Sequence, residues 1–282
     1  MEIIRNTLEI GLEKPVKLLH VTDTHLPLCD ERDNERKNEM AKRRTGMANA
    51  LEYLNEQIEY SKKNCDIMVH TGDLIDFVSL ANIEKACEVL SGNDDIFFIA
   101  GNHEYSQYMG EAWEDKAYRM NSYMEIERAG GFGVPMLWNS KTVGGVNIVG
   151  IDNSYNLFED WQIHHLKKEV DKGLPVILAF HAPLFEQSLY DYHYTVNKYD
   201  DCTYLTGLDE EHLLRYSEFR AYQQRPDEPT LRMIDYIKNE PMIKAILTGH
   251  LHFSYESMLT PSLPQYVTGG GYNGIARELT LI

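Results

Sequence analysis

Long hydrophobic runs are missing from this sequence of 282 residues, and their absence excludes a transmembrane helix, which needs roughly 18 or more consecutive apolar residues. The first 17 residues also lack the apolar core of a signal peptide, because Glu2, Arg5 and Glu9 interrupt them. We therefore expect a cytoplasmic protein that has no membrane partner.

Cysteine is scarce. The four cysteines, Cys29, Cys65, Cys87 and Cys202, lie far apart and form no C-x-x-C pair. This spacing argues against a disulfide framework and against a sulfur-ligated zinc site, and it predicts reduced thiols.

Basic residues are outnumbered: 27 Lys and Arg stand against 44 Asp and Glu, and the formal net charge is −17. Nucleic-acid binders present basic faces that release counterions from phosphates, so a nucleic acid polymer is disfavoured as a partner. The hydrophobic fraction of 43% is ordinary for a globular protein. We expect one domain spanning residues 1–282.

Five short apolar runs carry the most informative pattern, because each ends in residue types that ligate metals through nitrogen or oxygen. The runs begin at residues 16, 67, 96, 176 and 243. They are followed by Asp23 and His25, by Gly72 and Asp73, by Gly101, Asn102, His103 and Glu104, by His181, and by Gly249, His250 and His252. The functional crevice of an open α/β sheet lies beyond the carboxyl ends of its strands. We therefore predict that these endings converge on one site, with Asp73 near its middle.

Segments with apolar residues at helical spacing separate the first three of these predicted strands. Apolar residues recur at helical intervals from Met47 to Ile58, and Ser79 is a candidate N-cap for a second helix. The alternation of strand and helix predicts an α/β fold with parallel pairing. Helices are also expected over residues 105–129 and 161–170, strands over residues 2–10 and 143–151, and short strands after residue 252 that would complete a second sheet.

Two segments lie outside this pattern. Residues 30–44 are densely charged and are expected to form a solvated helix face from which a few side chains reach the substrate. Residues 182–228 form a long loop with seven tyrosines, at positions 190, 192, 194, 199, 204, 216 and 222. Such loops are usually functional or disordered, and the aromatic content argues against disorder. Because the segment leaves directly from His181, we predict a lid or wall over the site; a homo-oligomer contact is the alternative.

The motifs differ in how much information they carry. Asp23-Thr24-His25 is weak by itself, since about 0.7 D-x-H matches are expected by chance and Asp191-Tyr192-His193 matches without following a strand. Gly249-His250-Leu251-His252 is strong, with about 0.03 matches expected. The order D-x-H, G-D-x-x-D, G-N-H-E, a strand-end His and G-H-x-H resembles the calcineurin-like metallophosphoesterases, from about Lys17 to His252.

The resemblance implies a fold and a set of site residues. The fold would be a four-layer αββα sandwich of two mixed β-sheets, with a binuclear metal site at the carboxyl ends of the strands. By the same resemblance, one metal would be held by Asp23, His25 and His252, the other by Asn102, His181 and His250, and both by Asp73. His103 would be the catalytic residue beside the substrate, and Asp76 would orient it.

His20, His70, His164 and His165 are not expected to be metal ligands. His20 and His70 lie inside apolar runs and are expected to be structural. His164 and His165 precede a strand, at the end opposite the predicted site, so surface or packing roles are expected.

The residue types suit phosphoester hydrolysis on their own terms. Asp, Asn and His without Cys form a nitrogen and oxygen donor set that suits Mn, Fe or Zn. A carboxylate such as Asp73 can span two cations roughly 3.5–4 Å apart. The cations would make the site locally positive in an acidic protein, and a hydroxide bridging them would attack phosphorus in line. His103 would then protonate the leaving group.

Two positions narrow the range of expected substrates. Protein Ser/Thr phosphatases of this superfamily carry arginines where this chain has Phe77 and Ala100, so that activity is disfavoured. Without those charges the site favours a small phosphodiester over a dianionic monoester. The alternatives are a phosphomonoesterase, a nuclease of the same superfamily, which the net charge opposes, and a non-catalytic metal-binding scaffold.

Overall fold

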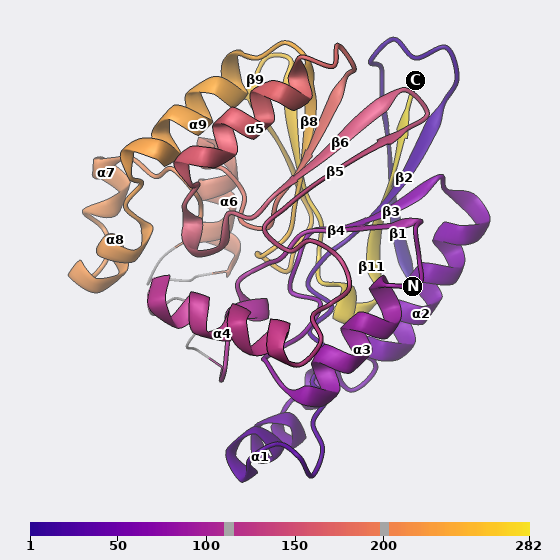
Figure 1. Ribbon diagram of the computed structural model, residues 1–282. Helices are drawn as coiled ribbons and strands as arrows, with labels where there is room; N and C mark the ends of the chain where they lie inside the picture. The colour runs from indigo at the N-terminus through magenta and orange to yellow at the C-terminus, as the bar shows by residue number, and fades with distance from the viewer. Residues whose placement is uncertain (110–115, 198–202) are drawn as a thin grey trace.

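Two β-sheets face each other in the computed structural model, which describes residues 1–109, 116–197 and 203–282 (Figure 1). The strand order of the five-stranded sheet is β1 (Glu2–Leu8), β11 (Ile275–Leu281), β2 (Val16–Val21), β3 (Ile67–His70) and β4 (Ile96–Phe98). The order of the six-stranded sheet is β5 (Trp138–Val143), β6 (Val146–Ile151), β7 (Val176–Ala179), β8 (Ile243–Thr248), β10 (Leu263–Val267) and β9 (Tyr255–Thr260). Both sheets mix parallel and antiparallel pairs, which confirms the predicted fold class.

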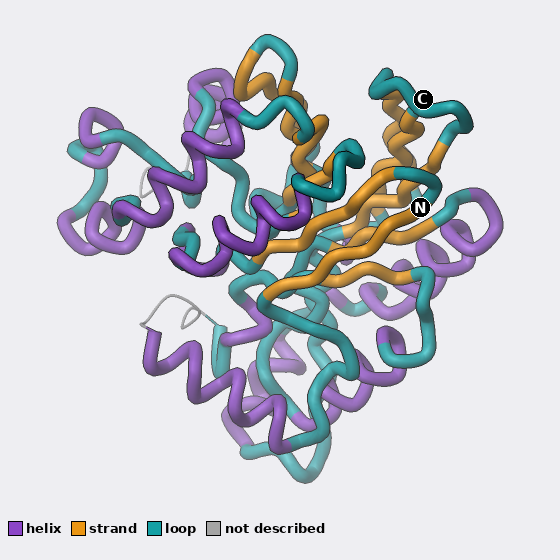
Figure 2. The backbone as a smooth tube through the Cα atoms, turned by 45° about the horizontal axis from the view of Figure 1, so that its top comes forward, coloured by secondary structure: helices purple, strands orange, loops and turns teal. Residues whose placement is uncertain are grey.

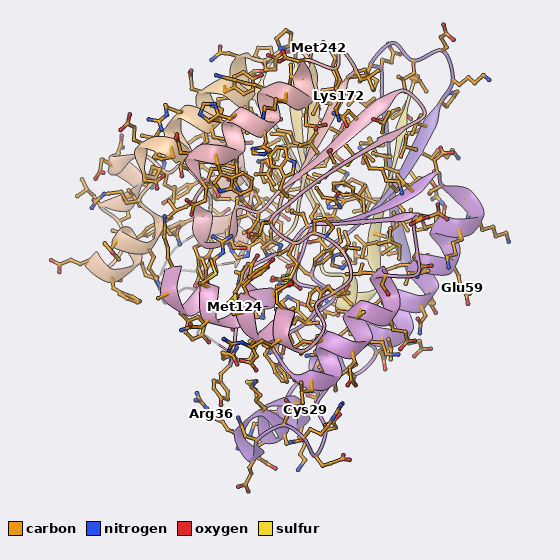
Figure 3. All side chains as sticks on the ribbon, in the orientation of Figure 1. Cys29, Arg36, Glu59, Met124, Lys172 and Met242 are labelled. Carbon is orange, nitrogen blue, oxygen red and sulfur yellow. The ribbon has the colours of Figure 1, made fainter. Side chains whose placement is uncertain are left out.

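Helices cover the outer faces of both sheets (Figure 2). On the five-stranded sheet these are α2 (Ala50–Asn64), α3 (Leu80–Leu90) and α4 (Lys116–Arg128). On the six-stranded sheet they are α5 (Asp160–Val170) and α9 (Glu228–Asn239). The short α1 (Glu35–Arg43), which carries Arg36, extends beyond the layers and lies near Cys29 (Figure 3). Ser79 caps α3, as its sequence predicts.

Successive side chains of a strand point to opposite faces of the sheet, and this alternation allows the four layers to pack. Leu18 of β2 packs between the two sheets, with Val69 of β3 and Ile177 of β7. The next residue, Leu19, points to the opposite face and packs against α2 and α3. Because neighbouring residues serve different interfaces, each strand must be apolar on both faces, and this is why the strands read as continuous apolar runs.

The strands that precede the predicted ligands are parallel within each sheet. β2, β3 and β4 run parallel in one sheet, and β7 and β8 in the other. Parallel neighbours end at the same edge of a sheet, so the residues that follow them are brought together.

The carboxyl-terminal strands only partly follow the sequence prediction. β9 and β10 form an antiparallel hairpin in the six-stranded sheet, but β11 returns to the five-stranded sheet, between β1 and β2. Leu279 and Leu281 of β11 are buried between the sheets. The prediction that all these strands complete the second sheet is wrong for β11, because alternation does not specify which distant strand becomes the partner.

Residues 182–228, called here the tyrosine-rich segment, also differ from the prediction of a long loop. The segment contains α6 (Gln187–Asn197), α7 (Glu210–Leu213) and α8 (Glu218–Gln224). Tyr199 and Cys202 lie outside the described residues, as do residues 110–115 of the predicted helix over 105–129. Within that predicted helix, regular α-helix covers only Lys116–Arg128.

Cys29, Cys65 and Cys87 are free thiols. In the part of the chain that the structure describes, every helix is too short or too polar to cross a membrane.

Candidate metal centre

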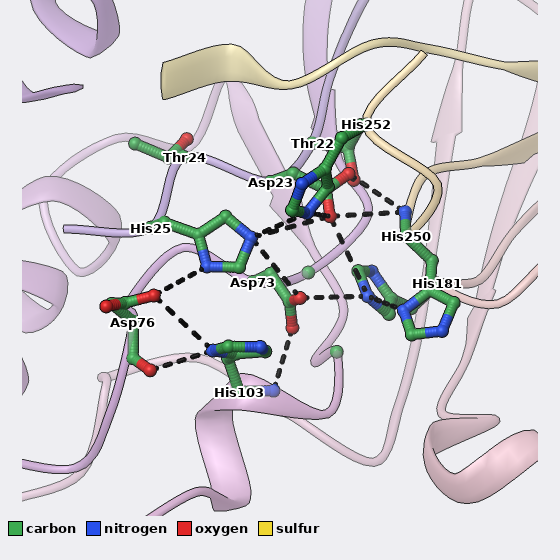
Figure 4. A network of polar contacts seen from close by, with 12 residues as sticks. Thr22, Asp23, Thr24, His25, Asp73, Asp76, His103, His181, His250 and His252 are labelled. Atoms are coloured by element: carbon green, nitrogen blue, oxygen red, sulfur yellow. Dashed lines mark hydrogen bonds and ion pairs between the residues drawn. The ribbon is translucent and has the colours of Figure 1, made fainter. Parts of the chain in front are cut away.

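The nine predicted site residues lie on the loops that follow β2, β3, β4, β7 and β8. We call this set the metal centre: Asp23, His25, Asp73, Asp76, Asn102, His103, His181, His250 and His252. Figure 4 shows its carboxylates and histidine rings pointing toward one another from separate loops. Residues up to 229 positions apart in sequence are thus neighbours, since Asp23 contacts His252.

Asp23, His25 and His252 form one compact group, with ligand atoms within 4.8 Å of one another. His252 Nε2 lies 3.2 Å from Asp23 Oδ1 and 3.0 Å from His25 Nε2. Asp23 and His25 are fully buried, whereas the His252 side chain is 36% exposed. This group is therefore open to solvent on the side of His252.

Asp73, His181 and His250 form a second group of the same compactness. His181 Nε2 lies 3.1 Å from Asp73 Oδ2 and 3.0 Å from His250 Nδ1. The same oxygen of Asp73 lies 3.6 Å from His25 Nε2, in the first group. One carboxylate thus faces both groups, which is the arrangement that a bridging ligand requires.

For His181 and His25, the hydrogen bond made by Nδ1 decides that Nε2 faces the middle of the metal centre. His181 Nδ1 donates to the Thr71 carbonyl at 2.8 Å; a carbonyl can only accept, so the lone pair lies on Nε2 and points at Asp73. His25 Nδ1 lies 3.0 Å from Asp76 Oδ1, which likewise directs Nε2 inward. Lone pairs aimed at carboxylate oxygens repel them unless a cation lies between. The donor set therefore fits metal ions.

The electrostatics of the site lead to the same conclusion. Burial lowers the pKa of His25, but the neighbouring carboxylates of Asp23, Asp76 and Asp73 outweigh burial and raise it to about 10. At His181 the charge of Asp73 likewise outweighs burial and raises the pKa to about 9. Burial raises the pKa of Asp73, but the surrounding histidines hold it well below its usual range. The site attracts positive charge, and metal ions can supply it in place of protons.

Asn102 adds an oxygen to the second group. It lines the same cavity as His181 and His250, and its Oδ1 is buried with no hydrogen-bond partner among the described residues. A buried carbonyl oxygen without a partner is costly, by about 1–3 kcal/mol. Coordination to a metal ion would satisfy it.

The backbone is strained at five of these positions. Asp23, His25, Asp73, His250 and His252 have φ angles between 50° and 69°, in the left-handed region. Such a conformation costs on the order of 1–3 kcal/mol for a residue with a side chain, and it persists only where the surrounding structure enforces it. Strain of this kind clusters at functional sites.

Glycines precede several site residues because the loops touch there. A Cβ atom on Gly72 would collide with the backbone of Gly101, and one on Gly249 would collide with Thr22 and Asp23. Only glycine permits this approach of the backbones. The glycines of the motifs therefore bring the loops close enough for their side chains to share ligands.

Glu104 clamps two of these loops together. Its buried carboxylate accepts hydrogen bonds from the backbone N–H groups of Asp73, Leu74, Ile75 and Gly101, at 2.7–3.2 Å. Burial, followed by the charge of Asp73, raises the pKa of Glu104 to about 7. The sequence places Glu104 in a motif without indicating a role, and the structure supplies one.

Asp76 contacts both His103 and His25. Its backbone carbonyl accepts a hydrogen bond from His103 Nδ1 at 2.8 Å, whereas its carboxylate lies 3.5 Å from that nitrogen. The carboxylate instead contacts His25 and accepts two hydrogen bonds from Arg44, at 2.6 and 2.9 Å. Asp76 thus orients His103 mainly through the main chain and His25 through its side chain.

Arg44 is a site residue that the sequence did not single out. Its only signal was its position in the charged stretch of residues 30–44, whose other acids and bases obscure it. Arg44 lies at the end of α1, and the fold brings its guanidinium into contact with the Asp76 carboxylate.

The other histidines have the expected structural positions. His20 is buried between the hydroxyls of Thr71 and Thr268, at 2.8 Å from each. His70 is buried with Nε2 2.9 Å from the Thr24 hydroxyl. His164 and His165 are exposed on α5, remote from the metal centre.

A cavity of about 630 Å³ lies beside the second group. Asn102, His181 and His250 line one part of it. The other walls come from α4, from residues 154–159 and from residues 204–227 of the tyrosine-rich segment. The Tyr204 ring meets His250 edge-on, with centroids 5.6 Å apart. The segment therefore contributes directly to the surroundings of the metal centre.

The sequence matches the model of a known protein family. The family described as calcineurin-like phosphoesterase matches residues 16–254, which include all nine residues of the metal centre. A search of curated proteins found no match.

The solved structures that this chain matches share little sequence with it. A dimetal phosphatase from Danio rerio is 10% identical, with 91% of this chain and 88% of that chain covered and a TM-score of 0.41. The NAD nucleotidase of Haemophilus influenzae is 14% identical, with 95% and 52% covered and a TM-score of 0.46. A 5'-nucleotidase from Candida albicans is 12% identical, with 96% and 47% covered and a TM-score of 0.41. The chain spans about half the length of these two nucleotidases.

Proposed function

The chain belongs to the calcineurin-like phosphoesterase family, and from this premise we propose that it hydrolyses a small phosphoester with two divalent metal ions bound at the metal centre. The observation that carries the proposal is the position of Asp73, whose Oδ2 faces His181 at 3.1 Å and His25 at 3.6 Å. Two separate mononuclear sites would not require one carboxylate to face both groups.

The proposed ligands form one set for each ion. Asp23, His25 and His252 would hold one ion, Asn102, His181 and His250 the other, and Asp73 both. When bound, the ions supply Lewis-acid stabilisation of the phosphoryl oxygens and a nucleophilic water. The donor types suit Mn, Fe or Zn.

His103 is the proposed catalytic residue. Its Nδ1 donates to the Asp76 carbonyl, so the ring is held in one orientation and Nε2 is available to exchange a proton with the leaving group. Its backbone N–H donates to Asp73 Oδ1 at 2.8 Å, which holds the residue beside the metal ligands. The His103 side chain is 15% exposed, so a substrate can reach it.

A phosphodiester is the substrate type that the charges favour. Phe77 and Ala100 are fully buried and bring no charge to the site. Arg44 is near, but its guanidinium is held in two hydrogen bonds by the Asp76 carboxylate. A diester carries one negative charge and needs less compensation than a dianionic monoester. The net charge of −17 further favours a small substrate over a polynucleotide.

The tyrosine-rich segment is proposed to act as a wall of the substrate site. It leaves directly from His181, and its residues 204–227 line the cavity beside His250. An interface with a second copy of the chain is the competing role, because tyrosine is also enriched at interfaces.

A substrate panel tests the proposed function. Cyclic nucleotides, nucleotides, sugar phosphates, bis-aryl and mono-aryl phosphates and single-stranded DNA would be assayed at fixed salt with Mn²⁺, with a chelator-treated control. We expect turnover of small diesters that the chelator abolishes. Activity confined to monoesters would contradict the diester preference. Turnover of DNA faster than that of every small substrate would contradict the charge argument. If the metal-loaded protein turned over none of the compounds, the proposed hydrolysis would be wrong and a non-catalytic metal-binding scaffold would be favoured.

A further inference from the structure

The aromatic side chains of the tyrosine-rich segment divide into two sets. Tyr190 and Tyr216 are buried in a hydrophobic cluster that also includes Leu251 and Val267 from outside the segment. Phe219 and Tyr222 line the cavity beside the metal centre, yet they are 53% and 78% exposed. They are three residues apart on α8 and therefore lie on the same face of the helix. Two exposed aromatic rings at the wall of a cavity mark a surface that gains by binding an apolar, planar group.

Asn156 provides a polar group on another wall of the same cavity. It lies in a short helical turn at residues 154–156 that packs against α8. The residue is only 9% exposed, and its Oδ1 has no hydrogen-bond partner among the described residues. Its φ angle of 60° is in the left-handed region, where Asn is tolerated better than most residues. A buried acceptor without a partner is suited to a ligand that brings an N–H donor.

The basic residues that line the cavity have acidic partners. Lys116 lies 3.3 Å from Glu159. Arg119 is bound by the buried Asp152, and Arg225 donates two hydrogen bonds to Glu210, each at 2.9 Å. The cavity is therefore poorly suited to a second phosphate group or another anion. It favours an uncharged group with aromatic faces.

We propose that this cavity binds the nucleobase of a nucleoside phosphoester. The base stacks on Phe219 and Tyr222 and donates an exocyclic N–H to Asn156 Oδ1. The phosphoester then lies at the end of the cavity formed by His181 and His250. This inference rests on the proposed hydrolysis, and it specifies the substrate class as phosphoesters of amino-bearing nucleosides.

Binding of nucleosides that lack phosphate tests the cavity independently of catalysis. Titration calorimetry on the metal-loaded protein would compare adenosine, purine riboside, which lacks the exocyclic amine, and ribose. We expect adenosine to bind several-fold more tightly than purine riboside, since one hydrogen bond is lost, and ribose to show no measurable binding. Equal binding of adenosine and purine riboside, or no binding of adenosine, would overturn the proposal.

Variants locate the binding to the named residues. Phe219→Ala and Tyr222→Ala should each weaken adenosine binding by about tenfold, as expected for loss of one stacking partner. Asn156→Gly keeps the backbone conformation and should remove the preference for adenosine over purine riboside, whereas Asn156→Asp retains an acceptor and should keep it. Leu214→Ala is the matched control, because Leu214 is 83% exposed in the same segment and does not line the cavity. Unchanged binding in both aromatic variants would overturn the assignment.

The failure of this inference and that of the proposed function would look different. Hydrolysis of simple aliphatic phosphoesters at the same efficiency as nucleoside phosphoesters would overturn the inference and leave the hydrolase intact. Tight, variant-sensitive adenosine binding without hydrolysis of any phosphoester would support the cavity assignment while rejecting the hydrolase.

Discussion

The metal centre and the tyrosine-rich segment are held in place in different ways. The metal centre consists of polar side chains, most of them buried, on the loops that follow strands of both sheets, with strained backbone and glycines where the loops touch. The segment packs in a hydrophobic cluster that includes its Leu189, Tyr190 and Tyr216 together with Leu251 and Val267 from the body of the fold, and it presents other aromatic side chains to solvent. The contrast indicates that the residues proposed for chemistry are fixed by the body of the fold, whereas Phe219 and Tyr222, proposed for specificity, depend on a smaller hydrophobic cluster at its margin.

The two regions meet at Leu251. Its side chain is buried in the hydrophobic cluster of the segment, while its neighbours His250 and His252 belong to the metal centre. Through this residue, packing in the segment is linked to the positions of two proposed ligands.

The largest expected effect comes from Asp73→Asn, which removes the charge shared by both metal groups. Asn tolerates the φ angle of 54° at this position, so the backbone should persist. We expect less than one metal ion per chain by elemental analysis and a loss of kcat beyond the roughly 10⁴-fold that a single general acid contributes. The control is Asp235→Asn, on the exposed face of α9. Two retained metal ions would show that Asp73 does not bridge them.

His103→Ala separates chemistry from metal binding. The variant should keep both metal ions and lower kcat by roughly 10²–10⁴-fold for substrates with poor leaving groups, because a general acid acts only in the transition state. The loss should be smaller for aryl esters, whose leaving groups need no proton. His164→Ala, exposed on α5, is the control. An unchanged kcat with poor leaving groups would mean that His103 has another role.

Arg44→Ala tests the support behind the metal ligands. It deprives Asp76 of two hydrogen bonds, and Asp76 in turn orients His25. Loss of such outer partners typically weakens metal binding by about 10–100-fold. Competition with a chelator would measure the effect, with the exposed neighbour Arg43→Ala as control. Equal metal retention in the two variants would show that Asp76 holds His25 without Arg44.

The smallest expected effects come from two substitutions in the hydrophobic cluster of the tyrosine-rich segment, Leu189→Ala and Leu251→Ala. Leu189→Ala leaves a cavity within the segment's cluster and should destabilise it by about 2–5 kcal/mol. We expect a raised KM with unchanged metal content, measured by kinetics and elemental analysis. Leu251→Ala should raise KM and also weaken metal retention, because Leu251 joins the two regions. A change in oligomeric state alone, seen by light scattering, would favour the interface role of the segment over the wall.

Much of the fold was predictable because it depends on local patterns. β2 and β8 have the bounds expected from their apolar runs, and Ser79 caps α3. The family match confirms the resemblance that the order of the motifs indicated. The structure brings the predicted site residues together, and their roles as ligands and catalyst stay predictions that the variants above test.

The sequence by itself determined which residues end the strands and that their chemistry suits a binuclear site, because residue type and periodicity are properties of neighbouring positions. Only the tertiary structure decided that β11 returns between β1 and β2, that Arg44 supports Asp76, and that Asn156 faces the same cavity as α8. These contacts join segments far apart in the chain. Each depends on how loops of many residues close against a common core, and no local spacing encodes that closure.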